Sequence, residues 1–213
     1  MLKIKSNIKM KDCAELFFLF SSFVYCSQSF ASICPSTTIT TSITCSGNIS
    51  TINNSGHGIQ LYNVAGSGNT NDNVNISGNI STVGRDARGV LFYNADGNGN
   101  SNTGNISGNI STVGVIANGL YLGNYYGSGH SNTIYMTGNI STIGDFASGI
   151  YLRNFDGIGN SNSVIMTGNI SAKGSGSYAI ELINDDASST NSIQLNKGSS
   201  IIGGIKFSGT SPT

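Results

Sequence analysis

The chain has 213 residues, a length that suits one domain, and glycine, asparagine and serine together make up about 42% of it. This excess of turn-forming residues argues against a helical bundle, and 38% hydrophobic residues with zero net charge argue against disorder. Because ten Lys and Arg are balanced by ten Asp and Glu, binding of nucleic acid by a basic face is not expected. The composition therefore predicts an all-β chain with many turns.

The first 31 residues have the pattern of an export signal. Four lysines precede an apolar run at residues 16–25, and the small residue Ala31 follows where a signal peptidase would cut. The run is too short to span a bilayer as a helix, which takes about 20 residues. We predict a signal peptide at residues 1–31 and an exported protein, with an uncleaved N-terminal anchor as the alternative.

Cleavage after Ala31 would leave two cysteines, Cys34 and Cys45, in the mature chain. In an exported protein, two cysteines this close in sequence favour a disulfide bond. Metal ligation is the rival interpretation, but two thiols without a nearby histidine or second pair do not complete a zinc site. We predict that the disulfide lies in an N-terminal cap formed by residues 32–46, and we predict no metal and no cofactor.

A repeat of about 30 residues occupies most of the remaining sequence. Each period contains three short segments with the alternating pattern of strands, and a Gly-rich loop of about nine residues separates the second from the third. A propeller would need about four strands and 40 or more residues per repeat, so it fits less well. The tetrapeptide G-N-I-S begins at Gly47, Gly78, Gly108, Gly138 and Gly168.

Residues one period apart form files of one chemical kind, which predicts an all-β, right-handed parallel β-helix of about five rungs over residues 47–209, followed by a tail at 210–213. The predicted apolar core files are Ile49, Ile80, Ile110, Ile140 and Ile170; Ile59, Val90, Leu120, Ile150 and Ile180; Leu61, Phe92, Leu122, Leu152 and Leu182; and Val74, Gly104, Ile134, Val164 and Ile193. The predicted structural ladder, in which each amide bonds to the next, is Asn63, Asn94, Asn124, Asn154 and Asn184.

The repeats G-N-I-S-T-V-G…A-x-G-I-Y-L-x-N, followed by the segment from Gly198, resemble passenger regions of bacterial autotransporters (type V secretion) over roughly residues 47–209. The resemblance implies a β-helix at the bacterial cell surface or outer membrane, or secreted, with an adhesin-like or display role. In that family a C-terminal β-barrel translocates the passenger, and no such barrel fits before Thr213. We therefore expect a truncated or split passenger, an outer-membrane translocator β-barrel encoded separately, and a host glycan or surface protein as partner.

Parallel β-helices also carry polysaccharide lyases and glycosidases, so a secreted carbohydrate-active enzyme is the alternative function. Asp96 and Asp156 occupy one column two periods apart, which corresponds to about 9.6 Å and approaches the carboxylate spacing of glycosidases. However, Tyr126 lies between them in the column, and no cluster of His, Lys or Arg accompanies them. We interpret both as turn residues and predict no catalytic residue.

Three further groups of polar residues bear on binding. The loop at residues 96–102 places oxygen ligands at alternate positions, which leaves calcium binding open. His57 and His130 fall in different columns, so we expect them at the surface or in loops. The threonines two residues after the first isoleucine file should face inward with it, which argues against a flat ice-binding array. Several tyrosines should face solvent, where their rings can contact a partner.

Overall fold

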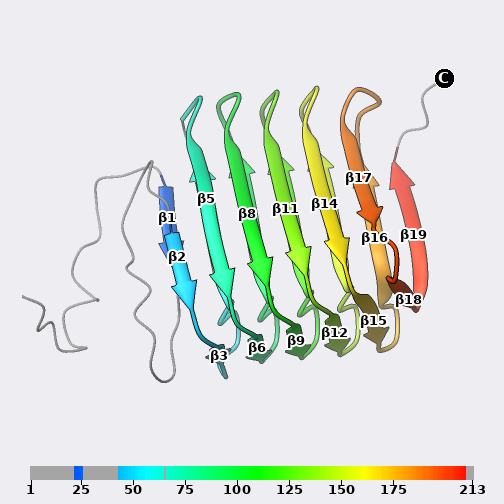
Figure 1. Cartoon of the computed structure of the whole chain (residues 1–213). Coiled ribbons are helices and arrows are strands. Elements are labelled where there is room, and N and C mark those ends of the chain that lie inside the picture. The colour runs from blue at the N-terminus through cyan, green and yellow to red at the C-terminus, as the bar shows by residue number, and fades with distance from the viewer. Residues whose placement is uncertain (1–21, 26–42, 65, 210–213) are drawn as a thin grey trace, which may run out of the picture.

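The computed structural model describes residues 22–25, 43–64 and 66–209, and it is a parallel β-solenoid of about five turns with about 30 residues per turn (Figure 1). The described residues form strands, turns and bends but no helix, so none of them forms a helix able to cross a membrane. The predicted fold class, an all-β parallel solenoid with a 30-residue turn, is confirmed.

Three sheets run along the solenoid, and each turn of the chain contributes one strand to each of them. Sheet A contains β1 (Ser22–Tyr25), β4 (Ile59–Val64), β7 (Val90–Ala95), β10 (Leu120–Tyr125), β13 (Ile150–Phe155), β16 (Tyr178–Asn184) and β19 (Gly204–Gly209). Sheet B contains β2 (Ile43–Ser46), β5 (Thr70–Ser77), β8 (Ser101–Ser107), β11 (Ser131–Thr137), β14 (Ser161–Thr167) and β17 (Thr190–Leu195). Sheet C contains β3 (Ile49–Thr51), β6 (Ile80–Val83), β9 (Ile110–Val113), β12 (Ile140–Ile143), β15 (Asn169–Lys173) and β18 (Ser200–Ile202). All strand pairs are parallel except β1 with β4, which is antiparallel.

The turn that contains the G-N-I-S motif explains why its glycine recurs in every repeat. Gly108 has a φ of +149°, in the region that favours glycine, and a Cβ added there would lie 2.0 Å from the carbonyl oxygen of Gly78. Successive turns therefore approach each other too closely for any side chain at this position. The Asn that follows is exposed, and in the next rung the backbone N–H of Asn139 donates to Oδ1 of Asn109 at 2.9 Å.

The core lies inside the three sheets, where side chains from successive rungs stack on one another. The apolar members of the predicted core files up to residue 180 are at most 6% exposed, while Leu182 and Ile193, near the C-terminal end, are only partly buried. Gly104 interrupts its apolar file because a Cβ there would come within 2.8 Å of the Phe92 ring. A small residue thus offsets a large one in the same layer. A further core file, which the sequence analysis did not include, contains Cys45, Ile76, Ile106, Met136, Met166 and Leu195.

The N-terminal segments bear on the predicted leader and cap. β1 lies inside the predicted leader, residues 1–31, and extends sheet A beyond β4, so removal of the leader would also remove this strand. Cys45 is buried and disulfide-bonded. Cys34 lies outside the described residues, so its pairing with Cys45 stays a prediction, as does the signal peptide.

Candidate ligand-binding groove

The predicted asparagine ladder lies inside the solenoid at the end of the sheet A strands. Asn63, Asn94, Asn124 and Asn154 are fully buried, and each donates its Nδ2–H to Oδ1 of the next rung at 2.8–3.0 Å. Each amide between the two ends of the file both donates and accepts along it, and Oδ1 of Asn63 accepts from Asn71, so these buried polar groups are satisfied by other protein groups. This ladder holds adjacent rungs in register, which is a structural role.

A second asparagine ladder runs beside the first, and the sequence analysis missed it. Its members stand at the second position of the sheet B strands. Their Nδ2–H groups donate to Oδ1 of the next member at 2.8–2.9 Å and to Oδ1 of the first ladder at 2.8–3.0 Å. In the sequence this ladder is marked by an Asn that follows Ser or Thr at the same position of every repeat. The pattern is hard to recognise because asparagine is abundant throughout the chain. The second ladder comprises Asn71, Asn102, Asn132, Asn162 and Asn191.

The two carboxylates considered for catalysis lie in turns that project into solvent. Asp96 and Asp156 are exposed, with φ of +56° and +47°, and Tyr126, between them in the column, has a φ of +50°. Asp tolerates this left-handed conformation better than most residues, so backbone geometry explains both positions. Among the described residues, no group of three His, Cys, Asp or Glu side chains is placed to hold a metal ion.

The loop considered for calcium does not direct its oxygens toward one point. Asp96 is exposed, whereas Asn100 and Asn102 are fully buried. Oδ1 of Asn100 accepts the backbone N–H of Asn69 at 3.0 Å, and Oδ1 of Asn102 accepts from the second ladder. The side chains of these two asparagines are therefore used in stacking, and the alternate spacing reflects the solenoid.

The two histidines were expected at the surface or in loops; both lie in loops between strands, but neither is at the surface, because His57 is 8% exposed and His130 is fully buried. Nδ1 of His57 accepts the backbone N–H of Arg88 in the next rung, and Nδ1 of His130 accepts that of Asn100 in the preceding rung, both at 3.1 Å. Burial lowers the pKa of both, and with the nearby Arg88 guanidinium it lowers that of His57 to about 4. Both histidines therefore act as neutral hydrogen-bond acceptors. In other rungs the side chains of Asn118, Asn160 and Ser189 accept the equivalent backbone N–H.

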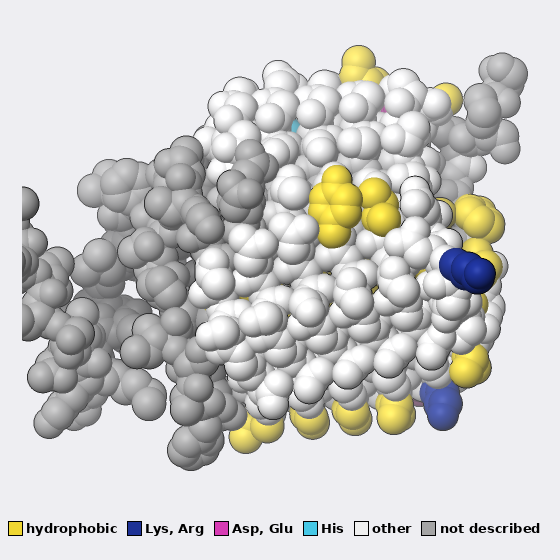
Figure 2. All heavy atoms as spheres, viewed as in Figure 1, with side chains coloured by type: hydrophobic (Ala, Val, Ile, Leu, Met, Phe, Trp, Pro, Cys, Tyr) yellow, Lys and Arg dark blue, Asp and Glu magenta, His cyan; other side chains and the backbone are white. Residues whose placement is uncertain are grey.

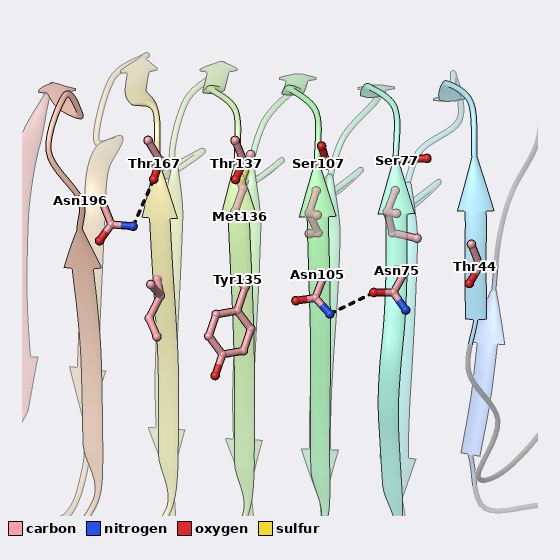
Figure 3. A pocket seen from close by; sticks show the side chains of 13 residues that line it. Thr44, Asn75, Ser77, Asn105, Ser107, Tyr135, Met136, Thr137, Thr167 and Asn196 are labelled. Atoms are coloured by element: carbon pink, nitrogen blue, oxygen red, sulfur yellow. Dashed lines mark hydrogen bonds between the residues drawn. The ribbon is translucent and has the colours of Figure 1, made fainter.

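A shallow groove of about 420 Å³ crosses the outer face of sheet B (Figure 3). Because residues two apart in a strand point to the same side, each strand contributes two outward side chains, which form two files along the solenoid. The residues between them, such as Met136, turn into the core. The first file is Thr44, Asn75, Asn105, Tyr135 and Ile165, and the second includes Ser77, Ser107, Thr137, Thr167 and Asn196.

The groove combines an aromatic ring with amides and hydroxyls and has no charged side chain in its lining. Tyr135 is 46% exposed and stands beside the half-buried Ile165, while Nδ2 of Asn105 donates to Oδ1 of Asn75 at 3.0 Å. Figure 2 shows the same face as largely uncharged, with a hydrophobic group near its middle and Lys or Arg only toward the C-terminal side. A neutral ligand with both apolar and hydroxyl-bearing surfaces matches this lining.

Most other tyrosines pack against one another on the outer face of sheet A. The rings of Tyr93 and Tyr125 stack with centroids 4.9 Å apart, and the Arg88 guanidinium lies 4.2 Å from the centroid of the Tyr121 ring. Tyr121 is 9% exposed, so the expectation that these tyrosines face solvent is wrong for this residue. Gly123 provides the space, because a Cβ there would lie 2.6 Å from the Tyr125 ring and 2.9 Å from that of Tyr121. This cluster covers the outside of the sheet and leaves fewer free rings than the sequence suggests.

Comparisons with known proteins find no matching family model, no matching curated protein and no matching solved structure.

Proposed function

We propose that this protein is an exported, surface-associated, passenger-like β-solenoid with an adhesin-like role, and that the groove on sheet B binds a neutral glycan. The observation that carries the proposal is the exposed ring of Tyr135 beside aligned amide and hydroxyl side chains. Sugars present apolar C–H faces that pack on aromatic rings, and hydroxyl groups that exchange hydrogen bonds with amides and other hydroxyls.

The direction of the groove favours a polymer over a small molecule. It crosses β5, β8, β11 and β14, and its second file repeats a hydroxyl side chain on each of these strands at the rung spacing of about 4.8 Å. A ligand that repeats along its length can make the same contacts on successive rungs. Each contact is weak and solvent-exposed, so we expect binding strength to depend on ligand length.

A binding role is also favoured over the enzymatic alternative by the lining itself. The groove contains no carboxylate, histidine or lysine to transfer a proton, and the exposed Asp96 and Asp156 are not among its residues. The stacked ladders suit a scaffold that holds this face rigid at a cell surface. The resemblance to autotransporter passengers supports export, with translocation by a separately encoded outer-membrane β-barrel.

A glycan array followed by titration calorimetry tests the proposal. We expect the protein to bind neutral oligosaccharides, with affinity that rises with chain length and changes little with salt because no charged group lines the groove. Tyr135→Ala should weaken binding at least about tenfold, the loss of roughly 1.4 kcal/mol. The matched control is Tyr126→Ala, which removes another exposed ring, 54% exposed, from a turn outside the groove.

Three results would contradict the proposal. The first is the absence of binding to any neutral glycan, and the second is an equal loss of affinity in both tyrosine variants. The third is binding only to sulfated or carboxylated glycans with strong salt dependence, which would place the ligand on a basic surface instead. Circular dichroism of each variant establishes that the fold is retained.

A further inference from the structure

Two tyrosines of β10 bring their hydroxyl groups into contact on the outer face of sheet A. Tyr121 and Tyr125 stand at outward positions of the same strand, and their hydroxyls share a hydrogen bond. Gly123 lies between them, and a Cβ there would come within 2.9 Å of the Tyr121 ring and 2.6 Å of the Tyr125 ring. The missing side chain of Gly123 therefore leaves the space in which the two rings approach each other.

Rings from the neighbouring rungs hold each member of this pair in place. The Tyr121 ring stacks on that of Tyr151 in the next rung, with centroids 4.9 Å apart and planes inclined by 11°. The Tyr125 ring stacks on that of Tyr93 in the preceding rung, again with 4.9 Å between centroids. The Arg88 guanidinium lies 4.2 Å from the centroid of the Tyr121 ring. The contact between the two hydroxyls is therefore set by packing between rungs, as well as by the spacing along one strand.

The paired hydroxyls match the geometry of one covalent product. When two phenols join through the carbons next to their hydroxyls, the product is a biphenol whose two hydroxyls lie side by side and share a hydrogen bond. Tyr121 and Tyr125 already hold their hydroxyls in that relation, so the ring carbons that would bond flank the contact. Holding two reacting groups together in this way removes much of the entropic cost of joining them.

We propose that Tyr121 and Tyr125 form an oxidation site, at which a one-electron oxidant joins the two rings as an intramolecular dityrosine. Each phenol gives one electron to the oxidant and its hydroxyl proton to water, and the two phenoxyl radicals form a carbon–carbon bond between their ortho carbons. Each ortho carbon then releases its hydrogen as a proton while the oxygen of the same ring takes one up, which restores both hydroxyls. The net change is the loss of two electrons, which the oxidant accepts, and of two protons.

A row of stacked rings connects the pair to solvent. Tyr62, Tyr93 and Tyr125 follow one another on successive rungs with centroids 5.2 and 4.9 Å apart, and all three are half-buried. Because an electron can pass between rings in contact, an oxidant at any of them can draw electrons from the pair. Burial raises the pKa of the Tyr121 hydroxyl, and it raises that of Tyr93 to about 12, so both phenols are protonated at neutral pH. The Arg88 guanidinium disfavours a positive charge on the Tyr121 ring, so the electron and the hydroxyl proton leave together.

Photo-oxidation of the full chain with tris(bipyridine)ruthenium and persulfate tests the proposal. We expect dityrosine fluorescence from a product that is still a single chain, is lighter by two hydrogens and carries the link between Tyr121 and Tyr125 on fragmentation in a mass spectrometer. Tyr121→Phe and Tyr125→Phe each keep the ring but remove the hydroxyl contact that aligns the pair, so each should lower the dityrosine yield more than about fivefold. The matched control is Tyr126→Phe, which removes the hydroxyl of a 54% exposed ring and should leave the yield unchanged.

A wild-type chain that gives no dityrosine overturns the proposal, as does a link that forms only between separate chains. So does a Tyr126→Phe variant that loses as much yield as the two test variants, because the coupling would then take place at exposed rings. Wild type unfolded in urea should give less of the same link, and an equal yield would show that the folded arrangement does not make the site. Circular dichroism before oxidation establishes that each variant retains the solenoid.

Discussion

The two ends of the solenoid are built from the same repeat but differ in how their core positions are covered. In sheet A, the first repeat strand buries Ile59 and Leu61 almost completely, while the last strand exposes Ile205 by 48% and Phe207 by 73% in the same two files. The residues are equally apolar at both ends. The difference shows that the same apolar position of the repeat can be buried at one end of the stack and exposed at the other.

The polar interior shows the same contrast. Asn124 in the central rungs bonds to both neighbouring rungs of its ladder, accepting from Asn94 and donating to Asn154. Asn184, by contrast, lies in register with Gly209, which has no side chain, so the ladder stops there. Each rung is stabilised mainly by its neighbours, and the terminal rungs should therefore open first.

The strongest test of this contrast replaces equivalent core residues at the centre and at the open end. Leu152→Asp places an unpaired charge in a fully buried site and should cost several kcal/mol, enough to unfold a marginal domain. Phe207→Asp changes a residue of the same file that is 73% exposed, so it should lower the free energy of unfolding by less than about 0.5 kcal/mol. Denaturant unfolding at low protein concentration measures both. Equal destabilisation would mean that the assigned strand facing is wrong.

The two buried histidines should make the solenoid less stable in acid. His57 has its pKa lowered from 6.5 to about 4, so the folded state resists protonation that the unfolded chain accepts. Its contribution is complete above about pH 6.5, falls as the pH drops toward 4, and amounts to roughly 3 kcal/mol in total.

The matched variant for this pH dependence is His57→Asn, because asparagine supplies the same kind of acceptor at Asn118 in the same file. Unfolding free energies measured from pH 7 to pH 4 should fall less steeply for the variant than for wild type. An identical slope in the two proteins would show that His57 does not cause the acid sensitivity. His130, whose pKa is also lowered by burial, should maintain part of the slope in both.

A smaller difference is expected between the centre and the end of the asparagine ladder. Asn124→Ala removes the acceptor of both Asn94 and Asn132 inside a dry core and should cost about 2–3 kcal/mol. Asn184→Ala, at a half-buried site that water can reach, should cost about 1 kcal/mol. Thermal melts of the two variants measure the difference, and a larger cost at Asn184 would contradict the idea that burial sets the value of each ladder bond.

The fold was predictable because it depends on two regular features of the sequence. The 30-residue period sets which residues stack, and alternation along each strand sets which side they face. The same rules located Leu152 in the core and Asn124 in a ladder. They failed at the second ladder, where Asn132 and its counterparts look like ordinary loop asparagines, and at His57 and His130, which replace asparagine or serine as buried acceptors.

The sequence by itself determined the repeat, the inward files and the uncharged character of the chain, since these follow from short-range periodicity. Tertiary structure decided which outward residues remain accessible. Tyr121 is covered because Gly123 in the same strand leaves room for its neighbours, whereas Tyr135 stays exposed beside smaller side chains and opens a groove. The exposure of Phe207 likewise depends on whether another rung lies beyond it. Coverage is set by neighbours about 30 residues away or at the end of the stack, and alternation along one strand carries no information about them.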